Sequence, residues 1–341
     1  MPFYKKFLAF ILLVSSAASA VFSLYVILEK QSPVLSNNSY NFSPAEFNSF
    51  PVFTFSNNTS YNLTTNNQSE ALATTTNGKV LGKIQETVLS PYSAPVSYNK
   101  VYLKNSTGIA IDLKKELSQK INIDIKKSLE PEVLIFSTHT TESYMLESRN
   151  YYTDKDATGT TDSSKNVVRI GNILKQKLEQ NGFSVMQSST IHDHPKFSGC
   201  YDRSAETVKS YLKKYPSIKI VIDIHRDSVN YDDGTKVKPT VVINGKKAAQ
   251  IMFVAGCEAG EVSGFPAWRE NLRLAAKIHQ SVESMYPSLA RPITFTARKY
   301  NLHLTNGSLL IEIGTEANTL SEAEYSAELL SNALIKVLNE L

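Results

Sequence analysis

Three short apolar runs, each leading to or carrying a histidine or glutamate, constrain the fold of this chain more than any other feature. They are residues 133–136 followed by His139 and Glu142, residues 218–224 followed by His225, and residues 308–314 with Glu312 inside. Apolar runs of this length without helical spacing are typical of buried strands in a parallel sheet. Because the active groups of such sheets gather beyond the carboxyl ends of the strands, we expect these side chains to converge.

Strand and helix signals alternate over the rest of the chain. Helical spacing predicts helices from residue 163 or 164 to 180 and over residues 204–215, 268–285 and 320–338, with further strands over residues 183–186 and 293–296. Asn244 and Gly245 separate two β-rich runs, 240–243 and 248–255, which predicts a hairpin. The pattern predicts a doubly wound, mostly parallel α/β sheet flanked by helices, with one antiparallel hairpin.

The amino-terminal third has a different composition. We expect residues 1–30 to form a cytoplasmic tip and transmembrane anchor, because an uncharged apolar run follows Lys5 and Lys6. A signal peptide is the alternative, since Ala18, Ser19 and Ala20 resemble a cleavage site. Residues 31–97 are rich in Asn, Ser and Thr and predict a flexible stalk. The catalytic domain is expected over residues 98–341.

Composition excludes several classes of protein. The chain has 341 residues, 42% of them hydrophobic, which is enough for a large core. Its net charge of +4 comes without a dense basic block, so we expect no nucleic-acid partner. It has neither a Gly-rich phosphate loop nor a Gly-x-Ser-x-Gly elbow. Cys200 and Cys257, the two cysteines, match no zinc-thiolate spacing and could form a disulfide or remain buried thiols.

The converging residues suit a zinc hydrolase. Catalytic zinc takes three protein ligands and keeps one position open for water, and His139, Glu142 and His225 supply that number. Glu312 is then placed to take and return a proton as the catalytic residue. Glu316 is the main competitor of Glu142 as the oxygen ligand.

Each of these residues also has a structural interpretation. A lone histidine after a strand, such as His139, is more often a hydrogen-bonded loop residue than a ligand. A salt bridge would satisfy Glu312 equally well, with Arg203, Arg226 or Arg298 as partner. The remaining histidines are left outside the metal site: His192 and His194 as surface residues, His279 in a helix, and His303, whose exclusion is the least secure.

Four motifs together resemble the stage II sporulation protein P family of spore-forming Gram-positive bacteria. They are Ser-Thr-His-Thr-Thr-Glu-Ser-Tyr (137–144), Asp-Ile-His-Arg-Asp-Ser (223–228), Ile-Glu-Ile-Gly (311–314) and Asn-Thr-Leu-Ser-Glu-Ala (318–323). The resemblance covers residues 98–341. A broader similarity is to zinc-dependent N-acetylmuramoyl-L-alanine amidases, which implies an amidase-like fold.

The resemblance implies a membrane-anchored zinc peptidoglycan hydrolase that acts in forespore engulfment. It would cleave the N-acetylmuramoyl-L-alanine amide and also peptide cross-links, as an additional endopeptidase. Zn²⁺ would be held by His139 and His225, with Glu312 as general base. The glutamate ligand lies farther beyond the first histidine in the broader amidases, so Glu147 and Glu316 stay open beside Glu142.

The same resemblance implies a location and partners. The protein would be a single-pass protein of the mother-cell or septal membrane, with its catalytic domain extracytoplasmic. Its partners would be peptidoglycan, the membrane, and stage II sporulation proteins D and M. Two alternatives stay open: a catalytically silent wall-binding or scaffolding module, and a zinc peptidase acting on proteins.

Overall fold

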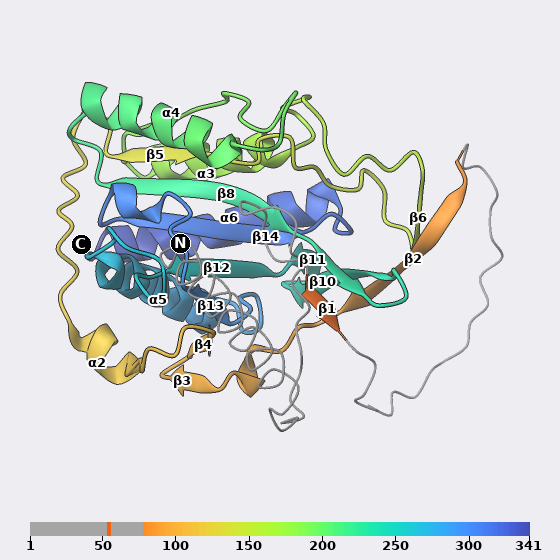
Figure 1. Cartoon of the computed structure of the whole chain (residues 1–341), viewed down its shortest axis with the longest axis horizontal. Coiled ribbons are helices and arrows are strands. Elements are labelled where there is room, and N and C mark those ends of the chain that lie inside the picture. Colours follow the sequence, from red (N-terminus) through yellow and green to blue (C-terminus); the bar gives the residue numbers. More distant parts are fainter. Residues whose placement is uncertain (1–52, 56–77) are drawn as a thin grey trace, which may run out of the picture. The chain divides into compact units, whose positions relative to one another are not determined.

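The structure is a computed structural model that describes residues 53–55 and 78–341 (Figure 1). The predicted anchor, residues 1–30, and most of the predicted stalk lie outside the described residues. Within the part of the chain that is described, no helix combines the length and apolarity needed to cross a membrane.

One eight-stranded sheet forms the centre of the fold, and Figure 1 shows β5, β8, β14 and β12 of this sheet in succession. In spatial order its strands are β3 (Val96–Tyr98), β4 (Val101–Asn105), β13 (Ile293–Thr296), β12 (Ile251–Gly256), β14 (Ser308–Thr315), β8 (Ile220–Asp227), β5 (Val133–Phe136) and β7 (Val185–Gln187). Only the pairs β12–β14 and β3–β4 are antiparallel, and the other five neighbouring pairs are parallel. The predicted mostly parallel sheet is confirmed.

Helices cover both faces of this sheet. On one face, α6 (Leu320–Leu338) packs between α3 (Val167–Gln180) and α5 (Trp268–Met285). On the other face, α4 (Cys200–Lys214) contributes Val208 to a cluster with Leu134 and Val221. Alternate strand residues such as Ile135 and Ile222 face the first group of helices. Burying each aliphatic side chain contributes about 1.5–3 kcal/mol, and this two-sided burial is what doubly wound folds require.

Helices α5 and α6 have the predicted boundaries, whereas α3 and α4 begin at other residues than predicted. The ranges of α5 and α6 are as predicted, and a short helix α2 (Leu113–Ser118) precedes the sheet. Helix α3 begins at Val167 because the Asn166 side chain accepts from the backbone N–H of Val168 and caps it there. Helix α4 begins four residues before the predicted Ser204, at Cys200.

A second sheet adjoins the first. Its strand order is β1 (Phe53–Phe55), β9 (Val229–Tyr231), β10 (Lys236–Ile243), β2 (Val80–Thr87) and β6 (Tyr151–Thr153), and β11 (Lys246–Ala249) pairs with β10. Only Ser228 separates β8 from β9, so the chain passes directly from one sheet into the other.

The predicted hairpin is present, with β10 and β11 joined through Asn244 (φ 49°) and Gly245 (φ 76°). The prediction of a single strand over residues 248–255 is wrong in part. β11 ends at Ala249 in the second sheet and β12 begins at Ile251 in the central sheet, so the chain passes from one sheet to the other at Gln250. The side-chain amide of Gln250 donates to the carbonyl oxygens of Leu89 and Ser288, which holds the chain between β11 and β12.

The predicted stalk ends too late at residue 97. Strand β2 pairs with β10, and η1 (Pro91–Ser93) and β3 follow it before residue 98. Ile84 is the buried residue of β2, and Glu86 lies 3.2 Å from the ammonium of Lys238. β1 also lies inside the predicted stalk. Backbone pairing to β9 and β10 therefore orders segments whose composition alone predicts flexibility.

Candidate active site

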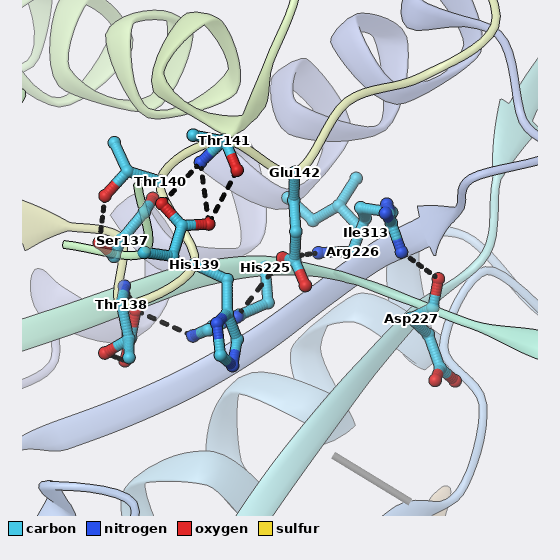
Figure 2. Close-up of polar contacts among 12 residues, drawn as sticks. Ser137, Thr138, His139, Thr140, Thr141, Glu142, His225, Arg226, Asp227 and Ile313 are labelled. Atoms are coloured by element: carbon cyan, nitrogen blue, oxygen red, sulfur yellow. Dashed lines mark hydrogen bonds and ion pairs between the residues drawn. The ribbon is translucent and has the colours of Figure 1, made fainter. Parts of the chain in front are cut away.

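His225 lies inside strand β8, two positions before its last residue, rather than after the strand as predicted. Its Nε2 lies 2.8 Å from Oδ1 of Asp223. Its Nδ1 lies 3.3 Å from Oε2 of Glu142 (Figure 2). Asp223 and His225 face the same way because strand residues two apart share a face. Burial alone would lower the pKa of His225, but the two carboxylates outweigh it and raise the pKa well above its ordinary value.

His139 lies in the loop that follows β5. The preceding residue fixes this loop, because the backbone N–H and Oγ1 of Thr138 donate to the two carboxylate oxygens of Asp223 at 2.8 and 2.7 Å. The ring centroids of His139 and His225 are 5.1 Å apart. Burial is the main reason that the pKa of His139 is lowered to about 4, so this imidazole is neutral at neutral pH.

Aromatic rings surround His139. Phe197 stacks on it at a centroid distance of 4.6 Å, and Tyr201, from the first turn of α4, meets it edge to face at 5.5 Å. Cys200 Sγ lies 3.7 Å from its Nδ1.

The sequence left open whether Cys200 and Cys257 form a disulfide or remain buried thiols. Both cysteines are free and buried in the structure.

Glu142 follows His139 by a turn in which its N–H donates to the His139 carbonyl oxygen at 3.1 Å. Its Oε2 also accepts the backbone N–H of Arg226 at 3.1 Å (Figure 2). Burial would raise the pKa of Glu142, but the hydrogen bond with His225 and the nearby positive charges lower it. This carboxylate is therefore ionised beside the imidazole.

Glu312 lies on β14 directly opposite His225 of the neighbouring parallel strand β8. Its side chain is fully buried, and neither carboxylate oxygen has a hydrogen-bond partner among the described residues. Burial raises the pKa of Glu312 well above its ordinary value, and the charges of Asp227 and Glu142 add to this while His225 opposes it. None of Arg203, Arg226 and Arg298 forms a salt bridge with Glu312, so the predicted structural alternative has no support in the described part.

His139, Glu142 and His225 are side chains of the types that bind zinc. Two ligands ~2.1 Å from a tetrahedral zinc lie about 3.4 Å apart, and Nδ1 of His225 and Oε2 of Glu142 lie 3.3 Å apart. Asp223 on Nε2 is the outer carboxylate that metal-binding histidines commonly have. Within residues 53–55 and 78–341, no group of three or more His, Cys, Asp or Glu side chains already has metal-holding geometry. The residue types and the His225–Glu142 spacing fit zinc.

The other predicted oxygen ligands lie elsewhere. Glu147 is exposed and lines a different pocket. Glu316 accepts from Ser228 Oγ at 3.0 Å and lies 3.7 Å from a guanidinium nitrogen of Arg226 and from the ammonium of Lys236. Among the three glutamates considered, Glu142 is the one that the structure places against His225.

Two functional contributions were missed in the sequence. Asp223 lies within an apolar run and is not among the predicted site residues, although a carboxylate two residues before a site histidine is itself a signal. His192, interpreted as a surface residue, is buried; its Nδ1 lies 2.8 Å from the Ser137 carbonyl oxygen and its Nε2 2.9 Å from Thr207 Oγ1. The adjacent Asp193 accepts from the N–H and hydroxyl of Thr141. These residues hold the loop that carries His139.

A family model and a curated relative both match this chain. The family model described as stage II sporulation protein P matches residues 27–335. Stage II sporulation protein P of Bacillus subtilis (strain 168) is 30% identical over 220 residues, which is 61% of this chain and 50% of the relative. The match thus spans about half the length of that curated relative.

The solved structures that match this chain are less similar to it in sequence. N-acetylmuramoyl-L-alanine amidase AmiC2 of Nostoc punctiforme has a TM-score of 0.36 and 16% identity, covering 63% of this chain and 99% of the amidase. The N-acetylmuramoyl-L-alanine amidase from Clostridium difficile 630 has a TM-score of 0.36 and 17% identity, covering 62% and 97%. At such TM-scores, the fold assignment rests on the strand order and helix packing described above.

Proposed function

Because the chain belongs to the stage II sporulation protein P family, we propose that it is a peptidoglycan hydrolase of sporulation that cleaves the N-acetylmuramoyl-L-alanine amide bond. The observation that carries this proposal is the pairing of Glu312 and His225 across two parallel strands, with Glu142 against the same imidazole. A buried carboxylate without a partner, beside a histidine and a second carboxylate, is the arrangement expected of a hydrolytic site.

His139, Glu142 and His225 would hold a zinc ion. When bound, zinc polarises the scissile carbonyl and lowers the pKa of water in the site. Asp223 orients His225 by accepting from Nε2, which leaves Nδ1 directed toward Glu142. The neutral state of His139 suits it to bind a cation without first losing a proton.

Glu312 would move the protons of the reaction. Its raised pKa makes it a stronger base than an ordinary carboxylate, so it can take a proton from water and return it to the leaving L-alanine amine. The buried position of Glu312 keeps bulk water from competing for that proton. The same group therefore acts first as base and then as acid.

The finer features of the family are proposals here too. We propose a single-pass anchor in residues 1–30 that places the domain outside the cytoplasm, at the mother-cell or septal membrane. Cleavage of peptide cross-links, and partnership with stage II sporulation proteins D and M, complete the proposal. The support for these features is the family membership.

Product analysis tests the proposal. The full chain, purified in detergent and supplied with zinc, is incubated with peptidoglycan from sporulating cells, and the products are identified by mass spectrometry. We expect peptides with a free L-alanine amino terminus and glycan with free muramic-acid carboxyl groups. Peptidoglycan that stays intact, or cleavage confined to a protein such as casein, would refute the amidase proposal.

A further inference from the structure

Two consecutive residues near the site, Tyr300 and Asn301, have left-handed backbone (φ 46° and 58°). A bulky side chain rarely adopts this conformation, and residues held in it cluster at functional sites. Two other left-handed pairs in the described residues have a structural reason. Asn99–Lys100 joins β3 to β4 and Asn244–Gly245 joins β10 to β11. Tyr300 and Asn301 lie between β13 and η2 (Leu302–Leu304) and close no hairpin.

The surrounding structure holds this turn in place. The side-chain amide of Asn301 donates to the Tyr201 carbonyl oxygen at 2.8 Å and to Ser204 Oγ at 3.0 Å. The turn also follows a loop that lies directly on β12, since a Cβ on Gly256 would come 2.1 Å from the Arg298 carbonyl oxygen. The strained conformation is therefore imposed from two sides.

The turn brings Tyr300 to the catalytic residues. Its ring centroid lies 5.8 Å from that of Tyr201, which in turn meets the ring of His139. Burial raises the pKa of Tyr300 to about 12, and the charge of Glu312 contributes, so the phenol lies within electrostatic reach of that carboxylate. The two tyrosines thus extend the candidate site away from His139.

Both tyrosines line a cavity of about 730 Å³. This volume lies within the range of sites for small organic ligands, roughly 300–1,000 Å³. The charged residues around it are Asp202, Glu261, Arg298 and Lys299, so two carboxylates balance two cations. A wall of aromatic rings with a balanced polar rim suits an uncharged ligand rich in hydroxyl and amide groups.

We propose that this cavity binds an N-acetyl sugar of the glycan strand, with Tyr300 as a specificity-determining residue that supports the face of the sugar ring. The inference rests on the proposed function and deepens it. In the substrate the sugars are uncharged, because the lactyl carboxyl of muramic acid is bound in the amide. Stem peptides carry free carboxylates, for which the balanced rim offers no excess of positive charge.

Binding measurements on the full chain test this without requiring turnover. The probes are a tetrasaccharide of N-acetylglucosamine and N-acetylmuramic acid whose lactyl carboxyl groups are capped as simple amides, and a free stem tetrapeptide, each titrated calorimetrically. The variant Tyr300→Asn removes the ring but suits left-handed backbone, and Tyr300→Phe keeps the ring. We expect Tyr300→Asn to weaken tetrasaccharide binding about ten-fold, as loss of an aromatic anchor does, and Tyr300→Phe to retain most of it.

Lys100→Asn is the matched control, because it makes the same relief of left-handed strain in the β3–β4 turn, away from the site. It should leave both titrations unchanged. A purely structural role for Tyr300 predicts a lower melting temperature in Tyr300→Asn with unaltered sugar affinity, which would overturn the inference. Loss of tetrapeptide binding instead of sugar binding would overturn it as well.

The proposed function is tested separately from the inference. If the wild-type chain binds the tetrasaccharide through Tyr300 but releases no peptide from peptidoglycan, the cavity assignment stands and the amidase proposal fails. If it cleaves peptidoglycan with the same KM in the wild-type and Tyr300→Asn forms, the amidase proposal stands and the cavity assignment fails.

Discussion

Two buried charged clusters in this molecule differ in how completely their charges are paired. In the Lys238 cluster, the ammonium of Lys238 lies 2.7 Å from Glu322 and 3.2 Å from Glu86, and it donates to Ser148 Oγ at 3.1 Å. In the proposed catalytic cluster of His139, Glu142, His225 and Glu312, the buried carboxyl group of Glu312 has no hydrogen-bond partner among the described residues. A buried charge with partners ties elements together, whereas one without partners costs stability and is retained for chemistry.

The largest expected effect is a loss of activity when the catalytic cluster, and not the Lys238 cluster, is changed. Glu312→Gln should lower kcat about 10³-fold, since it removes the group that we propose moves the protons of the reaction. Its melting temperature should not fall, because the amide has nearly the shape of the carboxyl group and no hydrogen-bond partner of Glu312 is left behind among the described residues. Rates of peptide release from peptidoglycan and thermal unfolding measure the two effects.

The matched control is Glu322→Gln, the same chemical change in the Lys238 cluster. It should destabilise the fold and leave activity per folded molecule intact. If Glu312→Gln unfolds the protein while Glu322→Gln abolishes kcat, the roles assigned to the clusters are reversed.

The second prediction concerns stability. Lys238→Met should lower the free energy of unfolding by about 3 kcal/mol, because it leaves the buried carboxylate of Glu322 without its cation, whereas Glu86 keeps Lys247. Urea denaturation followed by circular dichroism measures this. If the free energy of unfolding of Lys238→Met is unchanged or higher, the ion pairs of the Lys238 cluster do not stabilise the fold.

The third prediction concerns how Asp223 supports the histidine of the catalytic cluster. Asp223→Asn should weaken zinc binding about 10–100-fold, because outer carboxylates orient the histidine ligand and increase its basicity. Competition with a chromogenic chelator measures the affinity directly and without substrate. Unchanged affinity would mean that Asp223 only anchors Thr138.

The smallest effect is expected at the start of α6, next to the Lys238 cluster. Thr319 caps this helix, and Glu322 completes a capping box by reaching back to the Thr319 N–H. Thr319→Ala should cost about 1 kcal/mol of stability. Activity should not change. A drop in kcat would indicate that the two clusters are coupled through α6.

Much of the fold could be predicted because local patterns decided it. The apolar runs ending near His139, His225 and Glu312 became neighbouring strands β5, β8 and β14, and the ranges of α5 and α6 follow from helical spacing. Sheet membership was harder to predict. The run 248–255 is apolar except for Gln250, and the long-range contacts of Gln250 divide the run between two sheets.

The site was predictable as far as residue type goes. His139, Glu142, His225 and Glu312 lie together, but their pairing depends on the register between β8 and β14, which no local pattern encodes. His192 shows the converse: its loop is polar in sequence, yet the ring is buried by bonds to Ser137 and Thr207. Distant hydrogen-bond partners, rather than local polarity, determined its burial.

The direct passage from β8 into β9 has a mechanical consequence. An extended strand cannot be stretched appreciably along its axis, and only three residues separate His225 from Val229, the first residue of β9. Any force that pulls the second sheet along this strand is transmitted to the imidazole, whereas a flexible connection would absorb it. The position of His225 is therefore coupled, through the continuous strand, to the position of the second sheet.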